Sequence, residues 1–175
     1  MFTAFVALGI WVASRNLGAF KRNLVQSLIK RDNFLIPFIT HLGISMAYVF
    51  IAVVGVAFIE PAAIGSGIPQ IKCVLNGLKL PRVVRVKTLL VKAIGVAFSV
   101  SGGLPIGIEG PMIHSGAICG AGISQGKSTT LGVDTSFSKF RAFRNDKEKR
   151  DFVAAGAAAG VSCAFGAPIG GEICD

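Results

Sequence analysis

The charged residues of this chain fall into blocks, and the stretches between the blocks are almost free of charge. Segments 33–71 and 93–126 contain one carboxylate each, Glu60 and Glu109. Residues 152–171 contain no charged side chain. Each stretch is long enough for the about 20 apolar residues that cross a bilayer. Apolar stretches of this length between Lys/Arg clusters are typical of integral membrane proteins.

Composition supports the same class. Of the 175 residues, 52% are hydrophobic and 15% charged, whereas soluble proteins average about 25% charged residues. This composition excludes a disordered chain and an ordinary water-soluble enzyme. The 18 Lys and Arg exceed the 9 Asp and Glu by +9. Because the basic residues cluster beside apolar stretches, a lipid bilayer is the expected partner and nucleic acid is not.

We therefore expect an all-α, polytopic membrane protein. Phe34–Ile59 is long enough to span the bilayer. Thr88–Gly107 could span with Lys92 reaching the surface from its basic end. Phe152–Gly171 is a third candidate. Phe2–Ser14 is too short to span and lacks the basic start of a signal peptide, so it resembles the end of a longer helix.

Small residues dominate the third candidate. It contains Gly156-x-x-x-Gly160, and small residues let helix backbones approach closely in lipid. We expect a tightly packed helix rather than a ligand site, and we expect Pro168 to end or kink it.

Two glycine-rich breaks interrupt the apolar pattern, Gly65–Pro69 (GSGIP) and Gly107–Pro111 (GIEGP). Unwound backbone at membrane depth is tolerated where it is buried in protein or lines a polar cavity. Pro69 and Pro111 suit the first turn of a helix. Each break therefore predicts a helix N-terminus whose free N–H groups attract an anion. The candidate anion-binding residues are Gly65, Ser66, Gly67, Ile68, Pro69, Gly107, Ile108, Glu109, Gly110 and Pro111.

Glu109 is the candidate for chemistry, because a carboxylate at membrane depth is costly and usually functional. It could occupy the anion position itself and leave it when protonated. The alternative is a surface turn marked by Pro111.

Other motifs are weaker. Ala121–Ser128 fits a relaxed phosphate loop, but no buried strand precedes it, so a soluble nucleotide-binding protein is a remote alternative. The four cysteines form no C-x-x-C pair. His41 and His114 lie far apart in apolar runs and are expected to pack or form hydrogen bonds. No metal or other cofactor is expected.

The sequence resembles the CLC family of chloride channels and chloride/proton exchangers. The resemblance rests on GSGIP at 65–69, G-x-E-G-P at 107–111 and GAAAGVSCAFGAP at 156–168, in that order. The longer runs FIEPAAIGSGIPQIKCVLNG, EGPMIHSGA and EKRDFVAAGAAAG are most similar to the endosomal and lysosomal branch. The resemblance covers residues from about 40 to 171.

This resemblance implies a fold of broken and re-entrant helices and transport of chloride in exchange for protons across a late endosomal or lysosomal membrane. Ser66 would coordinate chloride through its hydroxyl, and Glu109 would be the gating and proton-transfer glutamate. The amides of Ile108, Glu109 and Gly110 would line the outer anion position. A homodimer, or association with full-length family subunits, is the expected assembly.

Three departures modify this expectation. Ile108 stands where the family has Lys or Arg, so chloride binding should be weaker. Glu172 comes too early to match the inner proton acceptor. The second half of the inverted repeat, with its G-x-F-x-P element, tyrosine and nucleotide-binding tail, has no counterpart in residues 1–175. We therefore expect one transmembrane half-domain over 1–175, which by itself is incomplete for transport; the alternative is a non-conducting subunit that associates with full-length members.

Overall fold

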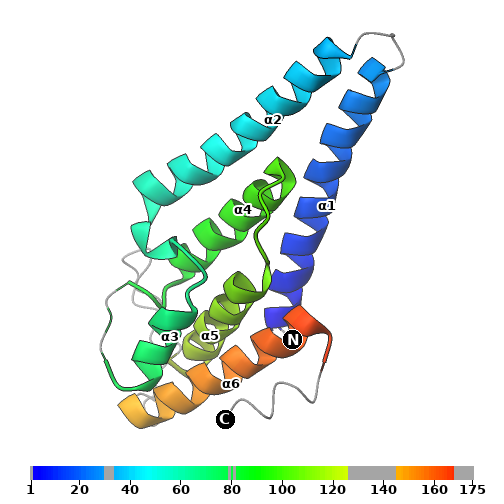
Figure 1. The fold of residues 1–175 in the computed structure, drawn as a ribbon. Helices are drawn as coiled ribbons and strands as arrows, with labels where there is room; N and C mark the ends of the chain where they lie inside the picture. Colours follow the sequence, from blue (N-terminus) through cyan, green and yellow to red (C-terminus); the bar gives the residue numbers. More distant parts are fainter. Residues whose placement is uncertain (1, 30–33, 79, 81, 126–144, 168–175) are drawn as a thin grey trace.

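A computed structural model describes residues 2–29, 34–78, 80, 82–125 and 145–167, and every regular element in these ranges is helical, as predicted. The helices are α1 (Phe2–Ile29), α2 (Leu35–Val54), α3 (Ile68–Leu75), α4 (Val86–Gly102), α5 (Glu109–Gln125) and α6 (Asp146–Phe165) (Figure 1). A π-helical turn (Gly55–Ile59) and a 3-10 turn (Pro61–Ala63) lead from α2 toward α3.

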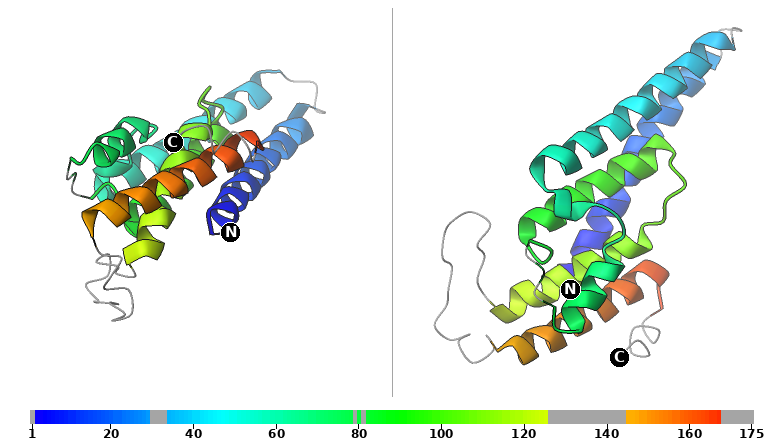
Figure 2. Two further views of the ribbon diagram at one scale, coloured as in Figure 1. Left: turned by 90° about the horizontal axis from the view of Figure 1, so that it is seen from below. Right: turned by 60° about the vertical axis from the view of Figure 1, so that its left-hand side comes forward.

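Three long helices build one end of the molecule and two build the other. Helices α1 and α2 run antiparallel and splay apart, and α4 packs against both (Figure 1). Helices α5 and α6 lie side by side below α4, and Figure 2 shows the same pairing from two further directions. The short helix α3 packs against α5 and α6. This arrangement brings the loops before α3 and α5 to the middle of the chain's fold.

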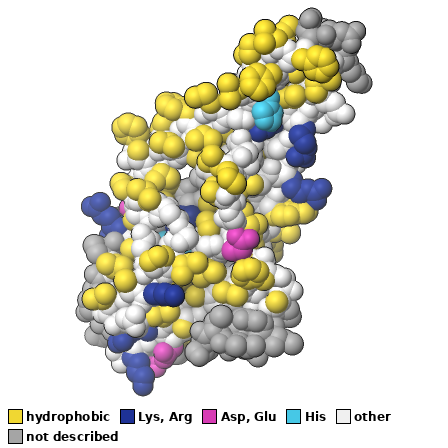
Figure 3. Space-filling model, viewed as in Figure 1, with side chains coloured by type: hydrophobic (Ala, Val, Ile, Leu, Met, Phe, Trp, Pro, Cys, Tyr) yellow, Lys and Arg dark blue, Asp and Glu magenta, His cyan; other side chains and the backbone are white. Residues whose placement is uncertain are grey.

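Helices α1 and α2 are the candidate membrane-spanning helices among the described residues. Phe2–Ile29 and Leu35–Ile59 are helical segments long and apolar enough to cross a bilayer, and the second agrees with the expected span at Phe34–Ile59. Their outward faces are open: Phe5 on α1 is 71% exposed, and Phe38 and Phe50 on α2 are 65% and 68% exposed. Figure 3 shows hydrophobic side chains over the α2 surface. Such a surface suits lipid or further helices, because apolar surface is unfavourable in water.

The expectation that Phe2–Ser14 is too short to span the bilayer is corrected, because this segment belongs to a longer helix. The helix that begins in this apolar segment continues past Arg15, Lys21 and Arg22 and ends at Ile29. Arg and Lys have high helix propensity, so charge alone does not end the helix. Lys21 is buried against neighbouring helices, where its Nζ donates to Ser45 Oγ at 3.0 Å and to the Gly102 carbonyl at 3.2 Å. A lysine at the carboxyl end of α4 also complements the helix dipole.

The expected span Thr88–Gly107 is also corrected. Helix α4 ends at Gly102, and Gly103 caps it in the left-handed region with φ 94°. Lys92 was expected to reach the surface, but its side chain is only 2% exposed and is hydrogen-bonded to His114. A partner within the protein replaces the water that a snorkelling lysine would seek.

Four glycines set the close approach of α5 to α6. A Cβ on Gly116 would collide with the Gly156 carbonyl, and one on Gly120 with the Phe152 carbonyl. A Cβ on Gly160 would lie 2.7 Å from the Ile113 Cα. The predicted packing role of Gly156 and Gly160 is confirmed, and the matching pair on α5 was not recognised from the sequence. Helix α6 starts before the expected Phe152 and ends at Phe165, where Gly166 adopts φ 62°; Pro168 lies outside the described residues.

The phosphate-loop alternative is not supported where the structure describes it. Ala121–Gln125 form the last turn of α5 rather than a loop. Residues 126–128 of the motif lie outside the described ranges.

The glycine contacts predict the effect of added volume. Gly156→Ala should destabilise the fold by about 1–3 kcal/mol, because its methyl group meets the α5 backbone, which cannot move aside locally. Gly122→Ala is the matched control, since no atom lies within 4 Å of its Cβ position on the same α5 helix. That control should be neutral or stabilising by up to about 1 kcal/mol, because Ala favours helix. Denaturant midpoints of the detergent-purified variants measure both changes, and equal midpoints would contradict the contact.

Candidate functional site

The structure brings the two glycine-rich breaks into contact. Gly110, the second residue of α5, is buried against Ser66 in the loop before α3. A Cβ at Gly110 would lie 2.6 Å from the Ser66 Cβ and 3.2 Å from the Ser66 Cα. Only a glycine permits this approach. The N-termini of α3 and α5 therefore meet at one place.

Gly67 shapes the first loop. It is the residue before α3 and has φ 83° and ψ −9°, a left-handed conformation that favours glycine. The imidazole of His114 occupies the space where a side chain on Gly67 would lie. The loop backbone thus rests directly on a buried ring of α5.

His114 is held by two hydrogen bonds that also fix its protonation. Its Nε2 lies 3.1 Å from the Val83 carbonyl oxygen, and its Nδ1 lies 2.7 Å from Lys92 Nζ. A carbonyl can only accept, so Nε2 carries the hydrogen and donates it. An ammonium can only donate, so Nδ1 accepts. The imidazole is therefore neutral, and the buried pair carries the single positive charge of Lys92.

Ser66 presents its hydroxyl at an exposed position. Its Oγ accepts the Ile68 backbone N–H at 3.4 Å, which stabilises the entry to α3. Because that bond uses an oxygen lone pair, the O–H hydrogen remains able to donate to a ligand. Ser66 can therefore accept the backbone hydrogen bond of the loop and donate a hydrogen bond to an anion at the same time.

Glu109 starts α5, and its carboxylate folds back over Gly107. A side chain on Gly107 would collide with that carboxylate. A negative group is stabilised near a helix N-terminus by the free N–H groups and the helix dipole. The Glu109 carboxylate thus lies at the kind of position that a small anion would take, and its side chain is only partly buried.

The remaining candidates lie in the two loops and in the first turns of α3 and α5. Gly65 and Pro69 are exposed, Gly67, Gly110 and Pro111 are buried, and Ile68 and Ile108 are partly buried. The expectation that His114 packs or forms hydrogen bonds is confirmed. The sequence did not predict that it pairs with Lys92 or that it supports Gly67. The available signal was a lysine and a histidine in otherwise apolar helices. His41, which was also expected to pack or form hydrogen bonds, does not pack in the interior: its side chain is exposed on α2.

Two neighbouring glycines separate backbone strain from steric contact. Gly65→Ala should cost about 1–2 kcal/mol, since Gly65 has φ 73° but no atom within 4 Å of its Cβ position. Gly67→Ala, at φ 83°, should cost a further 1–3 kcal/mol or so, because its methyl group displaces His114. Denaturant midpoints in detergent compare the two variants. Equal losses would show that His114 does not pack under Gly67.

Comparison with known proteins gives consistent matches. The chain is 52% identical to the mouse H(+)/Cl(-) exchange transporter 7 over 177 aligned residues, which cover 99% of this chain and 22% of the mouse protein. It is 53% identical to the bovine protein of the same name, with 99% and 22% coverage. Chloride channel protein D of Dictyostelium discoideum is 41% identical, with 99% and 17% coverage. The chain thus spans about a fifth of the length of these relatives.

The voltage gated chloride channel family model matches residues 45–174. The match includes both glycine-rich loops, their contact and the α5–α6 pair. Since it covers most of the chain, this protein belongs to the voltage gated chloride channel family, whose members are integral membrane proteins.

Proposed function

We propose that this chain forms the part of a chloride/proton exchanger that binds chloride and gates its path. The observation that carries the proposal is the contact of Ser66 with Gly110, which places a hydroxyl donor beside Glu109 and two helix N-termini. The names of the mouse and bovine relatives support exchange of chloride for protons. Because the chain spans a fifth of their length, the activity is assigned to an assembly that contains it.

Chloride would be held by hydrogen-bond donors from both loops. The Ser66 O–H donates from the first loop, and the backbone N–H groups of Ile108, Glu109 and Gly110 donate from the second. The α3 and α5 dipoles add positive potential at the same place. Lys92 adds a full buried charge behind the first loop, one hydrogen bond from the imidazole that supports Gly67. These groups replace the water lost by the ion.

Glu109 would be the gate. Its carboxylate competes with chloride for the donors at the start of α5, since both are anions. When the carboxylate takes up a proton it becomes neutral, loses that attraction and leaves the position to chloride. When it releases the proton and returns, chloride is displaced. Each cycle of the side chain therefore couples one proton to movement of chloride.

The exposed surface of α1 and α2 indicates what surrounds these helices. The open apolar faces of α1 and α2 fit lipid and further helices of a homodimer or of full-length family subunits. The similarity to exchange transporter 7 favours a late endosomal or lysosomal membrane. No cofactor is needed, because the donors and the gate are all groups of the chain. A non-conducting role beside full-length subunits is the alternative, and co-purification with such a subunit would support it if transport fails.

Transport in liposomes tests the gate. The protein, and the mouse exchanger whose matching segment is replaced by this chain, are reconstituted for measurement of chloride efflux and the accompanying pH change. In the chimera, Glu109→Gln should abolish proton movement while chloride continues to flow, because glutamine cannot exchange a proton at neutral pH.

Asp151→Asn is the matched control, since it removes an exposed carboxylate on α6, away from both loops. It should leave the proton-to-chloride ratio unchanged. Proton movement that persists in Glu109→Gln would overturn the assignment of the gate.

A further inference from the structure

The turn before α4 contains a strained residue. Arg82 has φ 67°, and in the described part of the chain it is the only residue other than glycine with a positive φ. This conformation is unfavourable for a residue with a Cβ, and it persists where the surrounding structure over-determines it. Arg82 itself is exposed, so burial of its side chain does not hold the turn. The neighbours of the turn must therefore hold its backbone.

Two contacts hold this backbone. The Thr88 hydroxyl, fully buried on α4, donates to the Arg82 carbonyl at 2.8 Å, so the bond leaves the helix and closes the turn. The next residue, Val83, is 5% exposed and packs in an apolar cluster. The other buried members of that cluster are Ile71 of α3, Ala117 and Ala121 of α5, and Val153 of α6. The turn is thus fixed to α4 by a hydrogen bond and to three other helices by packing.

The turn in turn fixes the buried imidazole of α5. The Val83 carbonyl accepts the Nε2–H of His114 at 3.1 Å, and Lys92 donates to Nδ1 at 2.7 Å. Lys92 follows Thr88 by four residues, so both side chains lie on one face of α4. Helix α4 therefore controls both ring nitrogens, one directly through Lys92 and the other through Thr88 and the turn.

The position of the ring sets the position of the loop before α3. His114 fills the space where a side chain on Gly67 would lie, and Ser66 directly precedes Gly67. Ser66 also packs against Gly110 on its other side. Because interiors are close-packed, a displaced ring moves the loop with it. Hydrogen bonds weaken steeply as their geometry worsens, so the Ser66 hydroxyl binds an ion well only while the loop is held.

We propose that Thr88 is a positioning residue for chloride: through the Arg82–Val83 turn and His114 it sets the affinity of the Ser66 hydroxyl for the ion. The proposal rests on the proposed function for the identity of the ion. In this role Thr88 does not contact chloride, and it takes no part in the proton step at Glu109. It therefore acts on chloride affinity and leaves the proton-to-chloride ratio unchanged.

The pair Thr88→Val and Thr88→Ser tests this role. Valine keeps the shape of the side chain but leaves the Arg82 carbonyl without its donor, whereas serine keeps the hydroxyl. In the mouse exchanger that carries this chain, Thr88→Val should raise the chloride concentration for half-maximal flux about fivefold, equivalent to about 1 kcal/mol, the size of one intramolecular hydrogen bond. Thr88→Ser should restore the original value. The maximal rate per folded protein should be the same in both variants.

The His114 Nε2 proton gives a second measurement that does not need transport. The chain has two histidines, and the other, His41, is exposed on α2 and serves as a reference. Nuclear magnetic resonance of the detergent-purified chain with ¹⁵N-labelled histidine measures exchange of ring protons with water. The Nε2 proton should exchange slowly in the unmodified chain and in Thr88→Ser. It should exchange faster in Thr88→Val by the same factor as the change in half-maximal chloride.

Thr40→Val is the matched control. It also removes a threonine hydroxyl that donates to a carbonyl at 2.8 Å, but that carbonyl belongs to Ile36 of the same α2 helix. It should leave both the chloride dependence and the His114 exchange unchanged.

Three results would overturn the proposal. The first is equal half-maximal chloride for Thr88→Val and Thr88→Ser, and the second is weaker chloride binding without faster exchange at His114. The third is a loss of maximal rate alone, which would indicate less folded protein. Proton movement in Glu109→Gln would contradict the gate and leave these comparisons intact. A chimera without flux would contradict the proposed function, and the exchange rates would then decide whether Thr88 positions His114.

Discussion

The hydrogen bond from the Lys92 ammonium to His114 connects most of the parts on which the candidate site depends. Lys92 belongs to α4 and His114 to α5, and the other imidazole nitrogen binds the Val83 carbonyl in the loop before α4. The same ring lies under Gly67. A buried ammonium without this acceptor would be strongly unfavourable. One bond therefore fixes the spacing of two helices and supports the loop that carries Ser66.

Glycine provides the second constraint. In lipid, helices gain little from hydrophobic association, so they rely on close packing. The α5–α6 contact uses Gly116 and Gly120 against Gly156 and Gly160. The same principle brings Gly110 to Ser66 at the site. Both the rigid pair of helices and the meeting of the two loops therefore require positions without a side chain.

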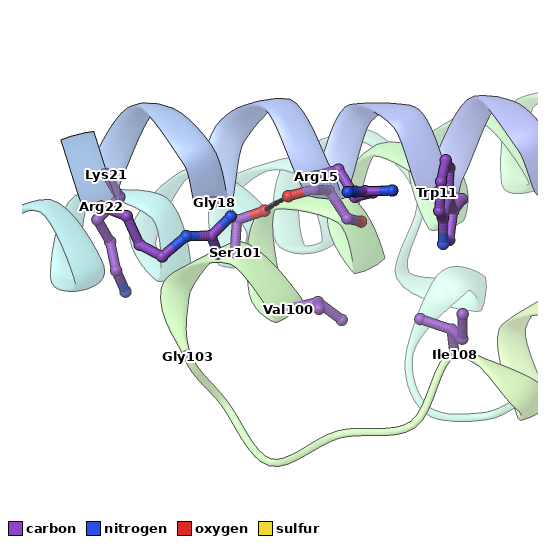
Figure 4. A pocket seen from close by; sticks show the side chains of 10 residues that line it. Trp11, Arg15, Gly18, Lys21, Arg22, Val100, Ser101, Gly103 and Ile108 are labelled. Carbon is purple, nitrogen blue, oxygen red and sulfur yellow. Dashed lines mark hydrogen bonds between the residues drawn. The ribbon is translucent and has the colours of Figure 1, made fainter.

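The basic residues of α1 acquire a different meaning in three dimensions. In the sequence they look like the charged end of an apolar run, and the resemblance to the family makes Ile108 look like a missing cation. In the structure Arg15, Lys21 and Arg22 line a cavity that also contacts Ile108 (Figure 4). Position 108 has no positive charge, but the basic residues of α1 supply positive charge on the opposite side of the cavity.

The sequence by itself determined the helical class, the candidate span at Phe34–Ile59 and the two helix-opening breaks, and it singled out Glu109 as the candidate for chemistry, because charge spacing and Gly/Pro chemistry are local properties. Tertiary structure decided the true extent of α1, the burial of Lys92, its bond to His114, and the contact of Ser66 with Gly110. These depend on which groups meet across distant parts of the chain. A buried polar group takes whichever partner the packing brings within reach, and no local pattern specifies that partner.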